Sequence, residues 1–335
     1  MFTYTLRRLL IAVPAVLMIS LVIFMLLELA PGDPMAEVPL TIPPEVKAKM
    51  REALGLDQPS WVRYLLWLKQ FFWVEPLHLV DHWFGTAYGA DMQRVLSWQT
   101  RSPVTELIAQ RLPQTLWVVG MGYLVGVSLA IPIGVISAYK QYSWFDQIGT
   151  FVSMVGFSVP TFFSGVLLIV VFSVYLQWLP SIYDTTLVVN SWATFLQQVK
   201  QMIMPIAVLA LFNAAQISRF LRASMLDNLG QDYVRTARSK GMRERVVVVV
   251  HVLRNSMIPV VTVIALGVPS IFAGAIITEQ VFKVNGLGHL LINAIQSNDL
   301  PMVQTLTFIF AVLIVFFNLI ADVLYGILDP RIRYE

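Results

Sequence analysis

Six long apolar segments constrain this chain more than any other feature of its sequence. A helix needs about 20 mostly apolar residues to cross the hydrocarbon core of a bilayer. The segments are Leu9–Ala30, Thr115–Ala138, Ile148–Leu179, Met202–Leu221, Met257–Thr278 and Val303–Ile327. The sequence therefore predicts an all-α integral membrane protein with six transmembrane helices.

The third segment is longer than one crossing requires, and Pro160 interrupts it. Proline removes a backbone donor and kinks a helix. We expect one kinked or tilted span, with a half-helix followed by a full helix as the alternative. Six spans place both chain ends on the same side of the membrane. With this arrangement most basic residues outside the long segment 31–113 fall on the same side as the chain ends.

The distribution of Lys and Arg predicts the orientation, because cytoplasmic loops carry an excess of these residues. The outer loops 180–201 and 279–302 hold only Lys200 and Lys283. Both termini are therefore expected in the cytoplasm. The predicted inner segments hold Arg7, Arg8, Lys140, Arg219, Arg222, Arg235, Arg238, Lys240, Arg243, Arg245, Arg254, Arg331 and Arg333.

Three parts follow from these boundaries: an N-terminal span at 1–30, an outer helical region at 31–113 and a core of five spans at 114–335. The first span is expected to be retained, because its apolar run exceeds the roughly 7–15 residues of a signal peptide. In the outer region, Pro44–Leu54 fits a helix, and Ser60 is expected to cap a second helix.

An aromatic stripe recurs at helical spacing along that second helix. Such residues suit the membrane interface, but the same face could pack against other spans, and both interpretations stay open. The stripe consists of Trp61, Tyr64, Leu65, Leu68, Phe71 and Phe72.

Several motifs of catalysis and coupling are absent from the sequence. There is no cysteine and no G-x-x-x-x-G-K-[ST] run, and the four histidines are scattered. The spans are nearly free of charge, with Glu28 and Asp322 only near the ends of the first and the last, whereas ion-coupled carriers place ionisable groups deep in the bilayer. We therefore expect a protein that is not an enzyme, with no catalytic residues, no metal site and no cofactor bound by this chain.

A basic segment, Gln231–Gly241, separates the fourth and fifth spans. Asp232 is expected to cap the start of a short helix, and Gly241 to end it in a left-handed turn. Arg238 and Lys240 fall in its last turn, where positive charge opposes the helix dipole. We interpret the segment as a helix that docks a cytoplasmic partner.

Within this helix Tyr233, Val234 and Ala237 share one face and are expected to form a small apolar docking patch. The following run Val246–Val250 is expected to be helical. The alternative is a buried strand, given the β-preference of valine, but an open sheet edge is excluded at the membrane.

Ordered landmarks along nearly the whole chain resemble the import permeases of ABC transporters. The run Asp232–Gly241, followed by His251–Asn255 and Pro259, resembles their "EAA" loop. The overall pattern is most similar to the first permease type of the dipeptide/oligopeptide/nickel group. The other landmarks are Ala30–Pro34, Leu54–Asp57, Arg111–Thr115, Phe157–Pro160, Thr278 and Glu279 with Phe282, Gly286–Gly288, Asp299–Pro301 and Leu328–Arg333.

The chain departs from the family pattern at a few positions. Arg235-Thr236 stands where the general pattern has Glu-Ala, and Arg254 stands where it has Pro. The peptide-type branch tolerates both changes. The usual Gly-Asp-Leu-Gly of the outer region is missing, and a bulky insertion from Trp73 to about residue 100 takes its place.

The resemblance implies a type I ABC importer permease fold, with an extra outer helical region between helices 1 and 2. It implies ATP-driven, binding-protein-dependent import of short peptides or peptide-like solutes across the bacterial cytoplasmic (inner) membrane. The implied partners are a second homologous permease, two ABC ATPase subunits that hold ATP and Mg²⁺, a periplasmic or lipid-anchored substrate-binding protein, and membrane lipids. No feature indicates nucleic acid.

Three other functions remain as alternatives to peptide import. The same permease type could import a nickel chelate, an opine, glutathione or a sugar conjugate. An ion-coupled secondary carrier would need an inverted repeat and midplane charges, and neither is evident. A membrane scaffold would have no reason to present a capped basic helix.

Site residues are assigned from the resemblance and from polar positions within spans. The cytoplasmic loop 222–256 is expected to couple to the ATPase through Asp232, Tyr233, Val234, Arg235, Thr236, Ala237, Arg238, Lys240 and Gly241. The expected substrate pathway or gate consists of Ser158, Pro160, Thr161, Asn213, Gln216, Glu279 and Phe282. The alternative for the polar members is hydrogen bonding between helices.

The outer loop Glu279–Pro301 is the expected contact for the binding protein. In it a turn at Gly286-Leu-Gly288 precedes a predicted helix from His289 to Asn298. The alternative is a re-entrant plug that only packs. The expected contacts are Gly286, Gly288, His289 and Asn298.

Overall fold

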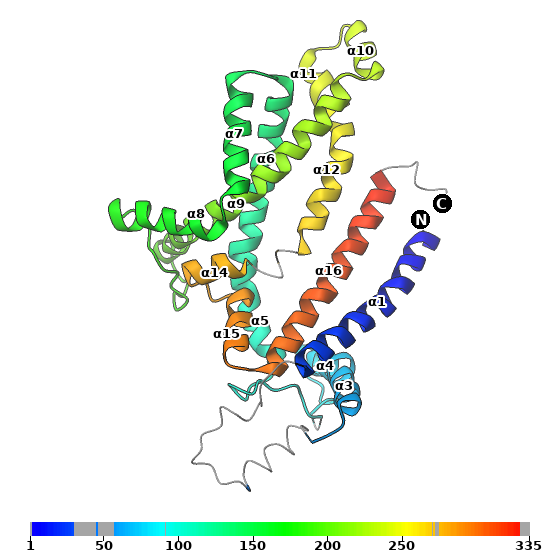
Figure 1. The fold of residues 1–335 in the computed structure, drawn as a ribbon, viewed down its shortest axis with the longest axis vertical. Coiled ribbons are helices and arrows are strands. Elements are labelled where there is room, and N and C mark those ends of the chain that lie inside the picture. The colour runs from blue at the N-terminus through cyan, green and yellow to red at the C-terminus, as the bar shows by residue number, and fades with distance from the viewer. Residues whose placement is uncertain are drawn as a thin grey trace. The chain divides into compact units, whose positions relative to one another are not determined.

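Figure 1 shows the fold in a computed structural model, which describes residues 2–29, 45, 57–90, 92–269, 271 and 275–328. Apart from one isolated bridge between Leu96 and Pro103, the described residues form helices, turns and loops. The predicted all-α class is therefore confirmed. The chain forms two compact units: unit 1 is 1–9, 112–289 and 313–335, and unit 2 is 10–111 and 290–312.

Among the described residues, five helices are long and apolar enough to span a membrane: Leu6–Glu28, Val104–Tyr139, Trp192–Leu229, Glu244–Gly267 and Leu300–Leu324. They correspond to α1 (Phe2–Glu28), to α5 (Val104–Thr115), η2 (Leu116–Gly120) and α6 (Met121–Tyr139), to α9 (Trp192–Leu229), to α11 (Glu244–Val246), η4 (Val247–Leu253) and α12 (Arg254–Gly267), and to α16 (Leu300–Leu328). The η segments are π-helical.

The expected third span is broken rather than kinked. Helix α7 (Trp144–Ser158) and the continuous pair α8 (Thr161–Leu168) and η3 (Ile169–Tyr175) meet at an angle of 104°. Pro160 occupies the N-cap of α8 with ψ 138°, an extended conformation that no helix continues through. The expected kink is therefore a sharp break between two helical segments, and the described residues hold five spans, or six if this bent pair counts as one broken span.

The expected fifth span is also shifted. It begins at Glu244, and the run Val246–Val250 is helical as predicted. It ends at Gly267 instead of Thr278, where the N–H of Val268 donates to Ala265 O at 3.2 Å, three residues back instead of four. Thr278 lies in a separate short helix, α14 (Ile276–Phe282).

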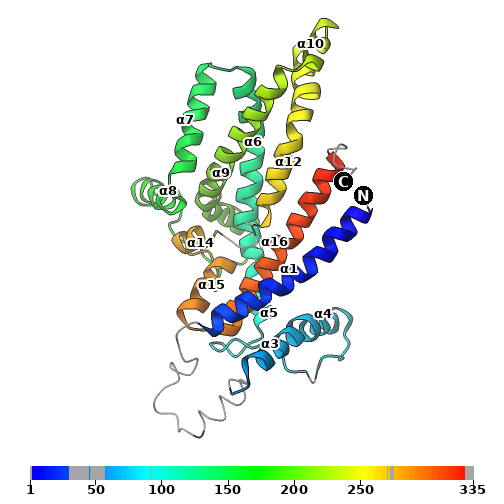
Figure 2. The same cartoon turned by 45° about the vertical axis from the view of Figure 1, so that its right-hand side comes forward.

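The core of unit 1 is built on α9, against which α6, α7 and α12 pack (Figures 1 and 2). Three glycines on α6 allow the closest contact. A Cβ atom at Gly122, Gly126 or Gly134 would lie 2.7–2.9 Å from atoms of α9. Small residues let the backbones of membrane helices approach closely, so this row fixes α6 against α9.

In unit 2, α3 (Ser60–Lys69) and η1 (Gln70–Val74) carry the aromatic stripe, followed by α4 (Glu75–Phe84). Part of the stripe packs on spans: Tyr64 lies 5.3 Å from Phe24 of α1, and Phe71 lies 4.8 Å from Phe308 of α16, between ring centroids. Trp61 is 67% exposed. Packing against the spans is therefore the correct interpretation for Tyr64 and Phe71 of the stripe, but not for Trp61.

Ser60 does not cap this helix. Pro59 is the N-cap without a side-chain hydrogen bond, and the Ser60 hydroxyl instead donates to Glu28 Oε1 at 2.9 Å. The capping prediction is wrong because Ser60 is already the first helical residue, one position past the N-cap. The helix expected at Pro44–Leu54 lies outside the described residues, except for position 45.

Candidate functional site

The short helix α10 (Asp232–Ser239) connects α9 to α11 (Figure 1). Gln231 is its N-cap, and no side chain caps the start. The predicted cap at Asp232 is therefore wrong: Asp232 is the first helical residue, its side chain is 95% exposed, and it lies 3.4 Å from Arg235. A carboxylate in the first turn still interacts favourably with the helix dipole.

The predicted end of α10 is confirmed. Gly241 adopts a left-handed conformation with φ +72°. Its N–H donates to Arg238 O at 2.9 Å, and the N–H of Met242 donates to Ala237 O at 3.4 Å. These two bonds form a Schellman motif, which satisfies the last carbonyls of a helix and stops it.

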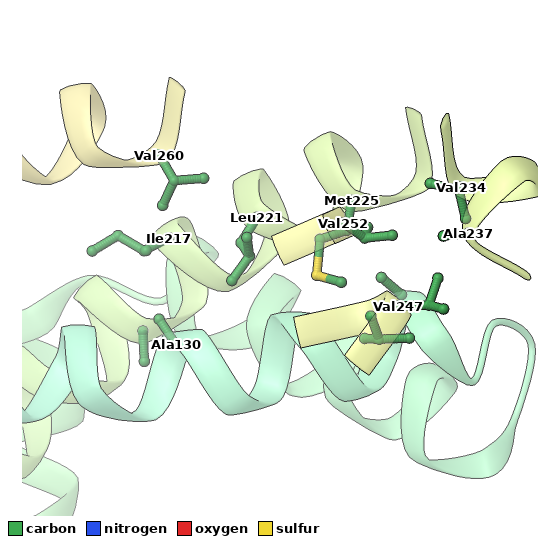
Figure 3. Close-up of a cluster of buried hydrophobic side chains, with 12 residues drawn as sticks. Ala130, Ile217, Leu221, Met225, Val234, Ala237, Val247, Val252 and Val260 are labelled. Carbon is green, nitrogen blue, oxygen red and sulfur yellow. The ribbon is translucent and has the colours of Figure 1, made fainter. Parts of the chain in front are cut away.

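The apolar face of α10 is buried within this chain (Figure 3). Val234 is 0% and Ala237 5% exposed, and both belong to a core cluster with Met225 of α9 and Val247 of η4. The expected apolar docking patch is therefore corrected to an internal anchor. Helical periodicity identified the face, but the neighbouring helices α9 and η4 already cover it.

Polar contacts hold the two ends of α10 as well. The guanidinium of Arg238 donates to both carboxylate oxygens of Glu244, at 2.7 and 3.2 Å. The hydroxyl of Tyr233 donates to Asn228 Oδ1 at 2.7 Å. The side of α10 that faces away from the core is therefore polar and basic. Its exposed members are Asp232, Tyr233, Arg235, Thr236, Arg238, Ser239, Lys240 and Gly241.

A buried ion pair supports this end of unit 1, and the sequence interpretation missed it. Asp146 in the first turn of α7 is 3% exposed and accepts from Arg222 of α9 at 2.6 and 2.7 Å. The N–H of Tyr142 also donates to Asp146. The spacing of Ser143 and Asp146 matches a helix N-cap followed three positions later by an acidic residue. That spacing could have identified the start of α7 and its carboxylate from the sequence.

A second buried site lies at the start of α15 (Leu287–Gln296). The carboxylate of Glu279 in α14 is 0% exposed. Oε1 accepts from Thr115 Oγ1 at 3.0 Å, and Oε2 accepts from the N–H of His289 at 2.9 Å. The N–H of Leu287 donates to Thr115 Oγ1 at 2.7 Å. The carboxylate thus satisfies N–H groups that a helix N-terminus leaves free.

This arrangement explains the Gly286-Leu-Gly288 pattern. A Cβ on Gly286 would lie 2.5 Å from Glu279 Oε1, and one on Gly288 would lie 3.0 Å from Oε2. The helix begins at Leu287, earlier than the predicted His289. The Glu279 carboxylate accepts a backbone N–H of its first turn, that of His289, and so stabilises this earlier start. Three of the landmarks therefore meet here, and one of them, Arg111–Thr115, is far from the other two in the sequence. Burial raises the pKa of the Glu279 carboxyl, while hydrogen bonds from His289, Thr115 and Gly288 oppose that rise.

Phe282 is only 2% exposed, and it lies against Gly165 of α8, where a Cβ would meet its ring at 3.2 Å. The role of Phe282 in the pathway or gate therefore stays a prediction, made now for a buried side chain. Asn298 is exposed, with φ +50°. It lies beyond α15, which ends at Gln296 rather than at the predicted Asn298.

None of the other pathway candidates hydrogen-bonds the Glu279 carboxylate in the described part of the chain. Ser158 ends α7, Thr161 begins α8, and Pro160 sits at the break between them. On α9, Asn213 donates to Leu209 O of its own helix at 2.8 Å, so this amide does not bridge two helices. Gln216 is exposed.

Two family models match the chain. The model of a binding-protein-dependent transport system inner membrane component covers residues 130–334. The N-terminal model of a binding-protein-dependent transport system membrane component covers residues 1–119.

Similar proteins match over nearly the full length of both chains. The oligopeptide transport system permease protein AppB of Bacillus subtilis is 38% identical over 338 residues, which is 100% of each chain. The glutathione transport system permease protein GsiC of Salmonella typhimurium is 36% identical over 339 residues, also 100% of each. A putative peptide transport system permease protein of Brucella abortus is 35% identical over 335 residues, 98% of each.

Proposed function

Because the chain belongs to the family of binding-protein-dependent transport system inner membrane components, we propose that it carries short peptides or peptide-like solutes inward across the bacterial cytoplasmic membrane. As a member of this family it is a multi-pass permease subunit of an ABC importer rather than an enzyme. Such a permease works with ATPase and substrate-binding components.

The observation that supports a peptide cargo is the similarity over whole chains to permeases named for oligopeptide, peptide and glutathione transport. Glutathione is itself a small peptide-like solute, so these names share one chemical class. A non-peptide cargo such as a nickel chelate, an opine or a sugar conjugate is the alternative within the same permease type.

The geometry of α10 supports its role as the contact for an ATPase subunit. Val234 and Ala237 fix one side of the helix in the core, and the Arg238–Glu244 pair ties its end to α11. The opposite side is exposed and basic. A displacement imposed on that side passes to α9 and η4 through packed side chains, because close-packed interiors transmit strain.

The complete transporter in this proposal contains a second, similar permease, two ATPase subunits and a periplasmic or lipid-anchored substrate-binding protein. ATP and Mg²⁺ are bound by the ATPase subunits, since this sequence carries no phosphate-binding loop. Both termini of the chain and α10 lie on the cytoplasmic side. The break at Pro160, the polar groups of α9 and the Glu279 site contribute to the pathway and its gate.

The test is uptake by the whole transporter reconstituted in liposomes with its binding protein outside and ATP inside. Labelled di- to pentapeptides should accumulate inside the vesicles, whereas vesicles given a non-hydrolysable ATP analogue should stay empty. The binding protein should also be stabilised by the same peptides in thermal-shift measurements. Binding of a nickel chelate or a sugar conjugate, with no peptide binding, would replace the peptide assignment by the alternative.

A further inference from the structure

We propose that a small cavity in unit 2 binds the phosphate of a phospholipid headgroup. This site is separate from the proposed transport function and from the α10 surface. The cavity measures about 220 Å³. Its described lining comes from α1, α3, η1, the loop after α4 and the start of α16: Phe24, Arg63, Leu66, Trp67, Gln70, Gln93, Arg94, Val95, Leu96, Trp98, Arg101, Pro301 and Gln304.

The polar lining favours an anion. The described lining residues include Arg63, Arg94 and Arg101 but no carboxylate. Arg63 is paired with Glu28, and the terminal nitrogens of Arg94 contact Glu75 and Glu106. Arg101 has no ion-pair partner among the residues that the structure describes, so its guanidinium remains available to pair with a bound anion.

Three nitrogen donors of the lining lack an acceptor in the described part of the chain. They are Trp67 Nε1, Arg94 Nε and Gln304 Nε2, each buried from solvent. Trp67 as a whole is only 5% exposed. Buried N–H groups are nearly always hydrogen-bonded in folded proteins, and a bound phosphate supplies several acceptor oxygens at once.

The backbone at Arg101 is a further sign of a built site. Its φ of +59° is unusual for a residue with a side chain. Such a conformation persists only when the surroundings fix it, and it is often found at ligand sites. Here Arg101 N–H donates to Ser97 O at 3.0 Å, which holds the turn beside the cavity.

The surroundings favour a lipid as the source of the phosphate. Phe24 and Gln304 belong to helices long and apolar enough to span the membrane. Near Phe24 on α1, Val22, Met25 and Leu26 are 50–64% exposed and offer an apolar surface for acyl chains. Trp67 and Trp98 suit the headgroup level, where tryptophan is enriched. A free phosphate ion would use the donors but not this apolar surface.

The experiment measures lipid retention by the delipidated whole transporter, with native mass spectrometry during titration with phosphatidylglycerol. Arg101→Gly removes the side chain, and glycine accepts the positive φ without strain. It should weaken lipid binding about tenfold, the effect of losing one charge-assisted hydrogen bond. Trp67→Phe keeps the ring packing and loses one neutral donor, so it should weaken binding roughly two- to tenfold.

Lys69→Ala is the matched control, because Lys69 is an exposed cation of α3 that does not line the cavity. Its lipid affinity should stay within about twofold of the unchanged protein. Equal retention by the unchanged protein and Arg101→Gly would overturn the proposal. A second titration of the delipidated transporter, with inorganic phosphate, separates the sources: phosphate binding as tight as lipid binding would reject a lipid site in favour of a free-phosphate site, and much weaker phosphate binding supports the lipid.

Discussion

The hydroxyl of Thr115 donates to the carboxylate of Glu279 across 3.0 Å, although 164 positions separate the two residues in the sequence. The same hydroxyl oxygen accepts the N–H of Leu287 at 2.7 Å. Thr115 therefore joins the end of α5 to both α14 and α15.

Thr115→Val should destabilise the protein by about 1–3 kcal/mol. The change keeps the volume but leaves Glu279 Oε1 and the Leu287 N–H without this partner, and an unsatisfied buried polar group has that cost. The measurement is thermal unfolding of the purified transporter, monitored through its tryptophan fluorescence. Thr161→Val is the control, because the Thr161 hydroxyl makes no hydrogen bond among the described residues; equal melting temperatures for the two variants would contradict the prediction.

Gly286→Ala should destabilise unit 1 by about 1–3 kcal/mol through overpacking. The added Cβ would lie 2.4 Å from Thr115 Oγ1 and 2.5 Å from Glu279 Oε1, so these groups would have to move. Gly230→Ala is the matched control, because nothing lies within 4 Å of a Cβ there and its φ is −82°. The prediction fails if both variants melt at the same temperature.

Glu279→Gln should change how stability depends on pH. Burial raises the pKa of Glu279 in the folded state above its ordinary value of 4.5, so the folded protein holds this proton more tightly than the unfolded chain. That contribution is fully present below pH 4.5 and is lost as pH rises through the folded pKa. The difference in melting temperature, unchanged protein minus variant, should therefore fall as pH increases above 4.5, and a flat difference would refute this account.

Gly241→Val should uncouple ATP hydrolysis from uptake, on the proposed role of α10. Space is not limiting at Gly241, since nothing lies within 4 Å of a Cβ, but φ is +72°. A left-handed conformation costs a residue with a side chain roughly 1–2 kcal/mol, and the helix end should unwind. Gly241→Asn is the control, because asparagine tolerates this conformation. Normal uptake by Gly241→Val, with normal ATPase binding, would show that this turn is dispensable.

Asp146→Asn should destabilise the protein by about 3 kcal/mol or somewhat less. Removing one charge of a buried pair leaves the other uncompensated, although the Arg222 side chain is 26% exposed and partly hydrated. Asp322→Asn should cost under about 1 kcal/mol, because its pair with Arg8 is exposed. Denaturation in mixed micelles measures both changes, and similar values would mean that burial of the Asp146–Arg222 pair has little effect.

Features encoded locally were predictable from the sequence. The left-handed end of α10 follows from Gly241, and the helical run Val246–Val250 follows from the membrane's exclusion of open sheet edges. The family resemblance is likewise confirmed by full-length matches. These features depend on a few adjacent residues or on ordered motifs.

Features set by tertiary contacts were not predictable. Periodicity placed Val234 and Ala237 on one face, but only the positions of α9 and η4 determine that this face is internal. Pro160 predicted a bend, but not one of 104°. The contact between Thr115 and Glu279 needs the folded chain, because the spacing of two residues so distant in sequence carries no signal.

The row of glycines on α6 has a consequence for how the protein is made. At about 5–20 residues per second, the ribosome needs a few seconds to synthesise the chain between Tyr139, which ends α6, and Trp192, which begins α9. During this interval α9 is not yet present, so the side of α6 that carries the three glycines is open to lipid tails. Apolar contact with lipid is as favourable as contact with leucine, so the expulsion of water does not drive α9 into place. Assembly of this core is instead an exchange of lipid for helix, decided by how closely the two backbones fit.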